Sequence, residues 1–418
     1  MNTEVYTNLE EETVKTLKWL GGFGSDPDGG VSRLLYSQEW VDAQESLAQL
    51  FKDEGLIVQK DEVGNLFGRL EGSTFKDETI LTGSHVDTVK NGGLYDGQYG
   101  IVAGFIAIKY LKAKYGQPLR NIEVVSMAEE EGSRFPYTFW GSNNIVGKVE
   151  KDDVKDLRDF DGILFEEAMH QAGCDYKKNP GKIRDDLKAF IELHVEQGNV
   201  LETEGIPIGI VQHIAGQKRF TIEINGQANH AGTTPMGYRK DAMNAACRMI
   251  HEMNDLALSY GDPLVATVGK MILEPNTVNV VPGKAVFTVD IRHTRRSVLT
   301  KFSEEMTAKM RDIASSLGVG IDIDMWMDAD PVPMDQKVVN IIKEQCIENK
   351  LNYKLMHSGA GHDAQNFAQV VPTAMIFVPS HNGISHNPDE YTEPRDLAEG
   401  VKALIGALYK LGYSKEGI

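Results

Sequence analysis

Apolar residues recur along the chain at two spacings, and these predict an alternation of helices and strands. Over residues 37–54 the apolar positions return at helical spacing, so this segment is expected to form an amphipathic helix that stops at Gly55. The predicted buried face of this helix carries Trp40, Leu47, Leu50 and Phe51.

Continuous apolar runs predict a set of buried strands elsewhere in the first half of the chain. Ile80–Ser84, Ile122–Met127 and Ala189–His194 have this character, and Gly100–Lys112 reads as a helix between the first two. Such alternation predicts an α/β domain with a mainly parallel, mixed sheet. Ligands bind where loops leave the carboxyl ends of parallel strands. The polar segments GSHVD, EEEGSRF and HVEQG occupy these positions.

The middle of the chain has a different order of elements, which predicts a separate, inserted domain. The expected strands are Phe220–Asn225, Val265–Ile272, Ala285–Arg292 and Gly318–Asp324, and the expected helices are Asp241–Leu258 and Ser297–Ser316. Strand–helix–strand–strand–helix–strand is the ferredoxin-like α+β pattern. We therefore expect an inserted domain over 212–329 and a catalytic domain built from 1–211 and 330–418.

The charge of the chain limits what it binds. Its 418 residues carry a formal net charge of −18, with a pI of about 5.1. Nucleic-acid binding normally requires a basic surface, so this class of partner is not expected. An anionic substrate would need a local cationic contact, because the surface as a whole is acidic.

Cysteine usage and the apolar runs favour a cytoplasmic protein. The three cysteines, Cys174, Cys247 and Cys346, are widely spaced and suggest no disulfide framework. The first twenty residues are acidic and lack the apolar core of a signal peptide. The longest apolar run, Ile101–Ile108, is too short to span a bilayer, so no membrane association is expected.

Candidate chemistry begins in the segment GSHVDTVKNGGLYDGQYG. His85 and Asp87 are two positions apart at a strand end, so they can share a face. A histidine that binds metal usually donates its other N–H to a carboxylate, a role that Asp87 is placed to fill. Asp96 lies in a glycine-rich turn and could bridge two metals. The alternative is that His85 caps a turn and Asp96 is an ordinary loop residue.

Three adjacent carboxylates, Glu129, Glu130 and Glu131, follow the strand that ends at Met127. Crowded like charges raise one another's pKa unless a metal or a proton intervenes. One such carboxylate can bind metal while its neighbour acts as general base. A solvated acidic loop is the alternative, since acidic runs are commonly that.

His194, in HVEQG, and His386, in GISHNPDEY, complete a possible metal site. Each histidine alone is better explained as a buried or loop residue. Together with His85 and two carboxylates, at corresponding strand ends, they suit a pair of divalent ions. Zn, Mn, Co and Ni are all compatible with this ligand set.

Seven motifs in family order give the chain a specific resemblance. These are GSHVDTVKNGGLYDGQYG, EEEGSRF, HVEQG, NHAGTTPM, DIRH, SGAGHDA and GISHNPDEY. The chain resembles the amidase–hydantoinase–carbamoylase family of di-metal peptidase-like hydrolases from about Gly30 to Glu393. That family includes allantoate amidohydrolases, N-carbamoyl-L-amino acid hydrolases and β-alanine synthases.

The resemblance implies a role for each residue of the metal site. His85 and His194 would bind one metal, Glu131 and His386 the other, and Asp96 would bridge them. Glu130 matches the family's general base. It would take a proton from water, the resulting hydroxide between the metals would attack the ureido carbonyl, and Glu130 would pass the proton to the leaving nitrogen. Glu129 is then an additional carboxylate with no direct role.

The resemblance also implies substrate contacts from the inserted domain, which would act as lid and dimerisation domain. His230 would stabilise the transition state from the partner subunit or on closure, and Asn279 would add a polar contact. Strand alternation places Arg292 with Thr288 and Asp290, away from the apolar face, where it suits a carboxylate. A surface ion pair with Asp290 is the alternative for Arg292.

Further residues refine the expected substrate. Gln197, Gln217 and Arg219 are candidate contacts to a ureido substrate, and Gly361 a backbone donor; for Gln217 and Arg219, hydrogen bonding at a strand edge is the alternative. The segments GQKRF and EEEGSRFPYTFWGS resemble the allantoate branch of the family most.

We therefore expect a homodimeric amidohydrolase with two divalent ions per subunit. It would cleave a ureido C–N bond of allantoate, a small carboxylate-bearing ureido compound, and release ammonia and carbon dioxide. An N-carbamoyl-L-amino acid hydrolase is the alternative activity. A catalytically silent metal-binding relative is a remote alternative, and a peptidase is disfavoured because the motifs follow the carbamoylase branch.

Overall fold

The computed structural model describes residues 8–416, so the first seven residues of the acidic N-terminal segment lie outside it. The chain folds into two compact units. The first unit combines the segment up to Gln212 with the segment from Pro333 onward, and the second unit spans His213–Val332. We describe each unit by itself.

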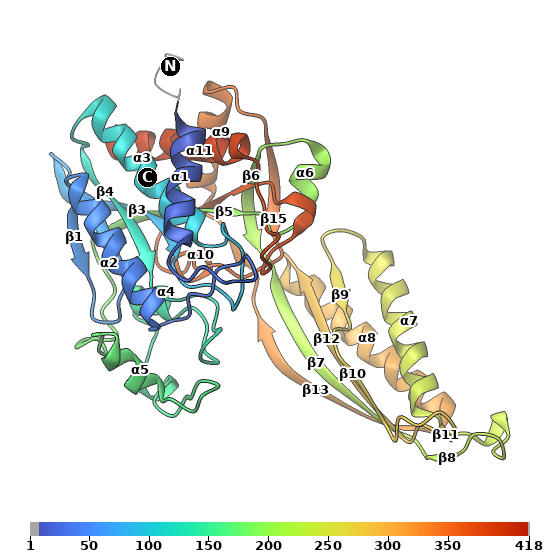
Figure 1. Cartoon of the computed structure of the whole chain (residues 1–418). Helices are drawn as coiled ribbons and strands as arrows, with labels where there is room; N and C mark the ends of the chain where they lie inside the picture. The colour runs from blue at the N-terminus through green and yellow to red at the C-terminus, as the bar shows by residue number, and fades with distance from the viewer. Residues whose placement is uncertain (1–7, 417–418) are drawn as a thin grey trace. The chain divides into compact units, whose positions relative to one another are not determined.

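A nine-stranded mixed sheet forms the centre of the first unit (Figure 1). Its strand order is β1-β2-β4-β3-β5-β16-β6-β14, and β15 also pairs with β6. The strands are β1 (Ile57–Lys60), β2 (Leu66–Leu70), β3 (Phe75–His85), β4 (Arg120–Met127), β5 (Leu187–Val195), β6 (Ile208–Ile214), β14 (Val332–Pro333), β15 (Tyr353–Ser358) and β16 (Thr373–Val378).

The four central strands, β4, β3, β5 and β16, run parallel to one another. This confirms the expected mainly parallel, mixed sheet. All eight residues of β4 are buried, and its four polar residues have hydrogen-bond partners, as buried polar groups require: Arg120, Asn121, Glu123 and Ser126. Parallel pairing places the carboxyl ends of these four strands at one edge of the sheet.

Helices cover both faces of this sheet. On one face α3 (Gln98–Tyr115) contacts β3 and β4, and α11 (Pro394–Tyr413) contacts α3 and β16; α1 (Leu9–Gly21), α2 (Gln38–Asp53) and α9 (Gln336–Glu348) join them. On the other face α10 (Ala364–Phe367) contacts β5 and β16. Three shorter helices, α4 (Trp140–Ile145), α5 (Phe165–Gln171) and α6 (Val200–Glu204), lie in the connecting segments.

Helix α2 shows how closely the apolar spacing predicted local structure. The Oγ atom of Ser37 accepts the backbone N–H of Trp40 and caps the helix. Trp40, Leu47 and Phe51 are buried as expected, whereas Leu50 is half-buried at the edge of the face. The helix supports β2, where Gly68 leaves space for the ring of Phe51.

The second unit has the ferredoxin-like order of strands (Figure 1). Its antiparallel sheet runs β10-β12-β7-β13, with β9 also paired to β12. Its elements are β7 (Gly216–Asn225), α7 (Ala242–Tyr260), β9 (Val265–Thr267), β10 (Met271–Glu274), β12 (Lys284–His293), α8 (Arg296–Leu317) and β13 (Gly320–Ala329). Beside the sheet, β8 (Asn229–His230) pairs with β11 (Val280–Val281).

One core holds this second unit together. Inward residues of β7 and β12, such as Ile222 and Phe287, pack against inward residues of the two helices, such as Met249 and Phe302. Along β12 buried and half-buried residues alternate without exception, so Arg292 lies on the face away from this core, as expected.

Two details of the second unit differ from the expected strands. The single strand expected over Val265–Ile272 is wrong: β9 and β10 are separate strands that pair with different parts of β12. The strand expected at Gly318 begins at Gly320, because Gly318 ends α8 with a φ of +64°.

Candidate functional site

Strand ends of the first unit bring the expected metal ligands together. His85 is the last residue of β3, and His194 is the last but one of β5. Glu131 follows β4, and His386 lies between β16 and α11. Because the four strands are parallel, these side chains converge at the carboxyl edge of the sheet.

Asp96 lies at the centre of the cluster. Its Oδ1 atom is 3.3 Å from His85 Nε2 and 3.1 Å from His194 Nε2. Its Oδ2 atom is 3.2 Å from His386 Nε2, which is itself 3.3 Å from Glu131 Oε1. The two oxygens of one carboxylate therefore face two different groups of side chains.

Gly97 explains why the loop of Asp96 can approach β3 so closely. A Cβ atom at this position would lie 2.4 Å from Cε1 of His85, and the backbone there has a φ of +65°. Only glycine meets both conditions without strain. Gln197 and His386 also have positive φ values, of 60° and 55°, although neither is glycine. Such conformations concentrate at functional sites.

Hydrogen bonds fix which ring nitrogen of two histidines faces Asp96. His85 Nδ1 lies 3.0 Å from the carbonyl oxygen of Asp87, and His194 Nδ1 lies 2.9 Å from that of Val195. A carbonyl oxygen only accepts, so each Nδ1 carries a proton and Nε2 is the ring nitrogen that a ligand can approach; in His194 this atom also accepts the backbone N–H of Gly97 at 3.2 Å. Buried histidines held in this way are typical metal ligands.

Asp87 joins two of the loops that surround the cluster. Its Oδ1 atom is 3.2 Å from His85 Nδ1 and accepts the backbone N–H of Glu130 at 3.0 Å. Its Oδ2 atom accepts the backbone N–H of Glu131 at 3.2 Å. This carboxylate thus links the orientation of His85 to the position of the acidic loop.

The residues present fit two divalent cations. His85, Asp96 and His194 form one group, and Asp96, Glu131 and His386 another; within each group the potential ligand atoms lie within 4.8 Å of one another. Imidazole nitrogens with carboxylate oxygens suit zinc and similar ions. Metal and protons compete for these atoms: the contacts of His386 with Asp96 and Glu131 raise its pKa to about 10.

Metal affinity is therefore expected to rise with pH. Between pH 6 and 8 the metal-free protein keeps the His386 proton, because its pKa of about 10 lies above this range. A metal must displace that proton, so the apparent dissociation constant should fall about tenfold or more per pH unit. Calorimetric titration at pH 6, 7 and 8 measures this. An affinity that does not change over this range would contradict it.

Glu390 is a site residue that the sequence did not reveal. Its buried carboxylate accepts the backbone N–H groups of Tyr95 at 2.8 Å and Asp96 at 3.1 Å, and burial raises its pKa to about 7. The hydroxyl of Ser385 lies 3.0 Å from Glu390 and 3.1 Å from Asp96 Oδ2. Glu390 thus ties the loop of Asp96 to the loop of His386. Glu390 lies four positions after His386, but no pattern in the sequence indicates that it would accept hydrogen bonds from Tyr95 and Asp96.

Replacing Glu390 with Ala should weaken metal binding. Two backbone donors beside Asp96 would lose their acceptor, and loss of such a supporting contact typically lowers metal affinity 10–100-fold. Glu390→Gln, which keeps an acceptor oxygen at the same place, should lose much less. Metal content after dialysis against limiting metal compares the two variants with wild type. Equal retention by Glu390→Ala and wild type would contradict the role.

The three carboxylates of the acidic loop, Glu129, Glu130 and Glu131, have different surroundings. The Glu129 carboxylate accepts the backbone N–H groups of Gly132 and Trp140, so it shapes the loop and is not directed at Asp96. Burial raises the pKa of the Glu130 carboxyl well above its ordinary value. Glu130 also belongs to a group with His85 and Glu131 whose ligand atoms lie within 4.8 Å. This position suits a proton acceptor beside the candidate metal ligands.

Two expected substrate contacts of the first unit also lie in this region. The amide of Gln197 donates to Asp96 Oδ2 at 2.8 Å, while its Oε1 atom is buried and has no hydrogen-bond partner in the described residues. Gly361 lies between β15 and α10, where a Cβ atom would come within 3.1 Å of the ring of Phe139.

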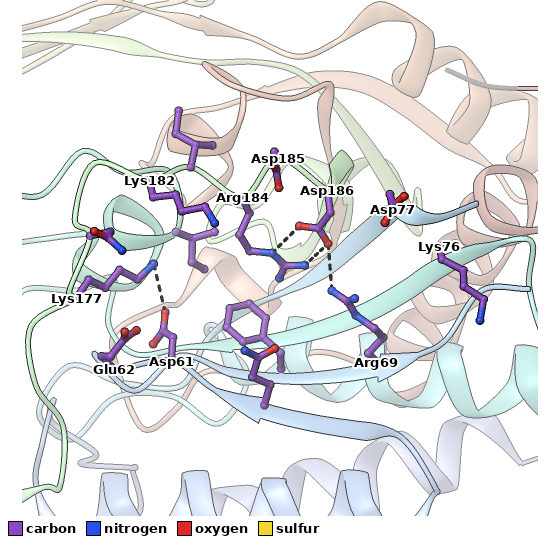
Figure 2. A pocket seen from close by; sticks show the side chains of 15 residues that line it. Asp61, Glu62, Arg69, Lys76, Asp77, Lys177, Lys182, Arg184, Asp185 and Asp186 are labelled. Carbon is purple, nitrogen blue, oxygen red and sulfur yellow. Dashed lines mark hydrogen bonds and ion pairs between the residues drawn. The ribbon is translucent and has the colours of Figure 1, made fainter. Parts of the chain in front are cut away.

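A cavity of about 490 Å³ at the other end of β5 contains ten charged residues (Figure 2). Asp186 there accepts from Arg69 at 3.1 Å and from Arg184 at 2.6 Å, and Lys177 is 3.7 Å from Asp61. Asp186 directly precedes β5, roughly 25 Å of extended chain from His194. The acidic and basic residues that line the cavity are equal in number, and several of them form ion pairs. The cavity therefore has no excess charge with which to select an ion.

The second unit holds the remaining expected site residues in two separate places. His230 pairs with Val280 across the β8–β11 ribbon, next to Asn279, whose carbonyl accepts the N–H of Ala231. Arg292 lies opposite Gln217, and Asp290 opposite Arg219, at the other end of β12. Arg292 also forms the ion pair with Asp290 that was the alternative to a substrate role, since its Nε is 2.9 Å from Asp290 Oδ1.

Comparison with known proteins supports the expected resemblance. The family model for peptidase family M20/M25/M40 matches residues 81–410. The chain is 53% identical to an allantoate amidohydrolase of Escherichia coli (strain K12), over 98% of this chain and 100% of that protein. It is 36% identical to an N-carbamoyl-L-amino-acid amidohydrolase of Pseudomonas sp. (strain NS671), over 94% and 96%.

A solved structure shows the same fold over nearly the whole chain. A hydantoinase/carbamoylase family amidase from Burkholderia ambifaria superimposes with a TM-score of 0.91, at 32% identity, covering 97% of this chain and 98% of that one. Across residues 8–416 we find no helix with the length and apolar character of a transmembrane segment. By its sequence and its fold, the chain belongs to peptidase family M20/M25/M40.

Proposed function

We propose that this protein is a metal-dependent amidohydrolase that cleaves a ureido C–N bond of allantoate and releases ammonia and carbon dioxide. The observation that carries the proposal is the cluster around Asp96 with Glu130 beside it, in a chain that is 53% identical to an allantoate amidohydrolase over 98% of this chain and 100% of that protein. Identity to an N-carbamoyl-L-amino-acid hydrolase is lower, at 36%, so that activity is the second candidate.

Five residues would hold two divalent ions per subunit. His85 and His194 would bind one ion, Glu131 and His386 the other, and Asp96 both, because its two oxygens face the two groups. Zn, Mn, Co or Ni suits this ligand set. When bound, such a pair activates a water molecule and polarises the carbonyl of the substrate.

The chain itself moves the proton. Glu130 takes a proton from the attacking water and delivers it to the leaving nitrogen, which departs as ammonia. Asp87 supports this step through its hydrogen bond to the backbone N–H of Glu130. Because Asp87 also lies 3.2 Å from His85 Nδ1, it keeps the base and a metal ligand in register.

Substrate recognition is assigned to residues of both units. Arg292 would bind the substrate carboxylate through its planar guanidinium group. His230 and Asn279 would contact the reacting group, and a donor aimed at a developing oxyanion is typically worth about 2.7–4 kcal/mol. The other proposed contacts are Gln197, Gln217, Arg219 and the backbone of Gly361.

The geometry of the second unit supports a homodimer. From Lys284, next to the ribbon of His230, β12 runs eight residues to Arg292, roughly 25 Å. One small substrate cannot touch both ends, so His230 and Asn279 of one copy would serve a substrate held by Arg292 of the other. Exposed apolar side chains that such an interface could bury are Leu258, Val265, Met271 and Ile272. Light scattering showing only monomer at micromolar concentration would contradict this proposal.

A reducing compartment suits the protein. Cys174, Cys247 and Cys346 are all free, and free cysteines persist in the cytoplasm, where thiols are kept reduced. We therefore propose the cytoplasm as the location of the enzyme.

A substrate panel tests the proposed activity. Purified protein loaded with Mn or Zn is incubated with allantoate and with several N-carbamoyl-L-amino acids, and released ammonia is measured. We expect kcat/KM to be highest for allantoate. Preference for a carbamoyl amino acid would favour the second candidate. No turnover of any ureido compound, with full metal content, would identify a catalytically silent relative.

A further inference from the structure

Arg33 is a fully buried arginine to which no role has been assigned. It lies in the segment between α1 and α2, and its side chain has no exposed surface. Burying a charged group costs free energy, which a paired carboxylate usually offsets. Within residues 8–416, however, the hydrogen bonds of this guanidinium group go to three backbone carbonyl oxygens and to no carboxylate. The burial of Arg33 therefore needs another explanation.

The three carbonyl oxygens belong to two separate parts of the first unit. Arg33 Nη1 donates to the carbonyl oxygens of Leu20 at 2.8 Å and Phe23 at 2.9 Å, at the C-terminal end of α1. Arg33 Nε donates to the carbonyl oxygen of Val86 at 2.6 Å. The negative end of the α1 dipole favours a cation at this place. The guanidinium group thus joins the end of α1 to the segment that follows β3.

Val86 lies between two residues of the candidate site, His85 and Asp87. Its backbone N–H donates to the carbonyl oxygen of Met127, the last residue of β4, at 3.0 Å. Its carbonyl oxygen is the acceptor for Arg33. That carbonyl belongs to the peptide bond that leads into Asp87, and a peptide bond is planar. Arg33 therefore fixes the plane from which the side chain of Asp87 extends.

Asp87 carries this constraint to the acidic loop. Its carboxylate accepts the backbone N–H of Glu130 at 3.0 Å and that of Glu131 at 3.2 Å. Its charge also acts on Arg33: burial lowers the pKa of the guanidinium group to about 9, and Asp87 opposes this shift. Arg33 therefore remains charged at neutral pH and attracts the carboxylate whose backbone it holds.

The backbone of Arg33 is tied to the same segment. Its N–H donates to Thr88 Oγ1 at 2.8 Å, and its carbonyl oxygen accepts the N–H of Thr88 at 3.0 Å. Thr88 Oγ1 in turn donates to the carbonyl oxygen of Val31 at 3.0 Å. These contacts do not involve the guanidinium group. Changing the side chain of Arg33 should therefore loosen Asp87 while the two segments stay together.

We propose that Arg33 is a positioning residue that aligns the general base Glu130 through Val86 and Asp87. The alternative is a purely structural role, in which Arg33 only attaches α1 to the sheet. The effect on catalysis rests on the proposed function, whereas the effect on the acidic loop can be measured without turnover. Because a misplacement of 1 Å can cost about 10²-fold in rate, a residue remote from the substrate can control kcat.

Arg33→Lys keeps the charge but replaces the planar fork with an ammonium group whose geometry does not match the three carbonyl oxygens. At saturating metal we expect kcat for allantoate to fall about 10–100-fold. The allantoate KM should change less than about threefold, because the carboxylate contact is assigned to the second unit. Arg33→Gln has no charge to desolvate, so it remains measurable should the lysine variant unfold, and we expect the same losses from it.

Hydrogen–deuterium exchange of the metal-free protein measures the acidic loop directly. The backbone N–H groups of Glu130 and Glu131 donate to Asp87, so their exchange reports how firmly Asp87 is held. In Arg33→Lys these two groups should exchange about tenfold faster or more. Unchanged exchange would overturn the positioning role, whatever the activity of the variant.

Arg120 supplies the matched control. It is a buried arginine at the start of β4, and its Nη1 atom donates to the carbonyl oxygens of Leu411 and Ser414 at the C-terminal end of α11. Arg120→Lys therefore disturbs the same kind of contact at the opposite end of the strand. It should lower the unfolding temperature, as Arg33→Lys does, but leave kcat and the exchange of the acidic loop unchanged.

A double-mutant cycle with Asp87 tests the route of the effect. In an Asp87→Asn background, Arg33→Lys should lower kcat less than about threefold, because the residue through which it acts is already altered. Losses that multiply in the double variant would overturn the proposal. Wild type that releases no ammonia from allantoate, with exchange still faster in Arg33→Lys, would overturn the proposed function and leave Arg33 as a positioning residue of the acidic loop.

Discussion

Replacing Glu130 with Gln is expected to lower kcat by about 10²–10⁴-fold while the protein keeps its metal content. Glutamine has nearly the same shape but cannot take the proton of the attacking water. The backbone N–H of residue 130 would still donate to Asp87, so the loop should keep its place. Substrate binding should persist too, and the allantoate KM is expected to change little.

Two measurements make the Glu130→Gln result interpretable. The metal content per chain of Glu130→Gln, determined by elemental analysis, should equal that of wild type. Glu39 is an exposed carboxylate on α2, and the control variant Glu39→Gln should retain full activity. Turnover of Glu130→Gln within about threefold of wild type would remove Glu130 from the mechanism. Loss of metal along with activity would show that it acts as a ligand and not as a base.

Asp96→Asn should also abolish activity, but for a different reason than Glu130→Gln: it should lose the metal. Asp96 is the side chain shared by both groups of potential ligands. An amide keeps the size of the carboxylate but removes its charge and one of its two acceptor oxygens, so neither ion would be held well. The loss of affinity should exceed the 10–100-fold that removal of a supporting residue costs. Turnover at micromolar metal should fall by at least about 10³-fold.

Added metal distinguishes this effect from damage to the base. Millimolar metal should restore part of the Asp96→Asn activity, whereas it should not restore Glu130→Gln. Asp28→Asn, an exposed aspartate in the same unit, is the matched control. Wild-type metal content in Asp96→Asn would show that Asp96 is not a shared ligand.

The sequence was sufficient to predict the features that depend on local spacing. The runs at Ile80–Ser84, Ile122–Met127 and Ala189–His194 are buried parallel strands, and the chemistry lies at their carboxyl ends. Alternation along β12 placed Arg292 on the open face correctly. These features follow from periodicities of two and of 3.6 residues, which a single chain displays directly.

Features that depend on contacts between distant segments were not predictable in this way. Glu390 acquires its role only because its loop folds back onto Tyr95 and Asp96, almost 300 positions earlier. Trp326 faces Arg219 because the pairing of β13 is irregular at that point, and no residue type in the sequence predicts this irregularity. The separation of His230 from Arg292 along β12 likewise appears only once the register is known.

Metal titration of the stripped protein tests the central claim most directly. The protein is dialysed against a chelator, a divalent metal is added back in known amounts, and ammonia release from allantoate is followed at each step. We predict that activity is absent without metal and reaches its maximum at two equivalents per chain. Full ammonia release by the metal-free protein, or none at saturating metal, would contradict the account.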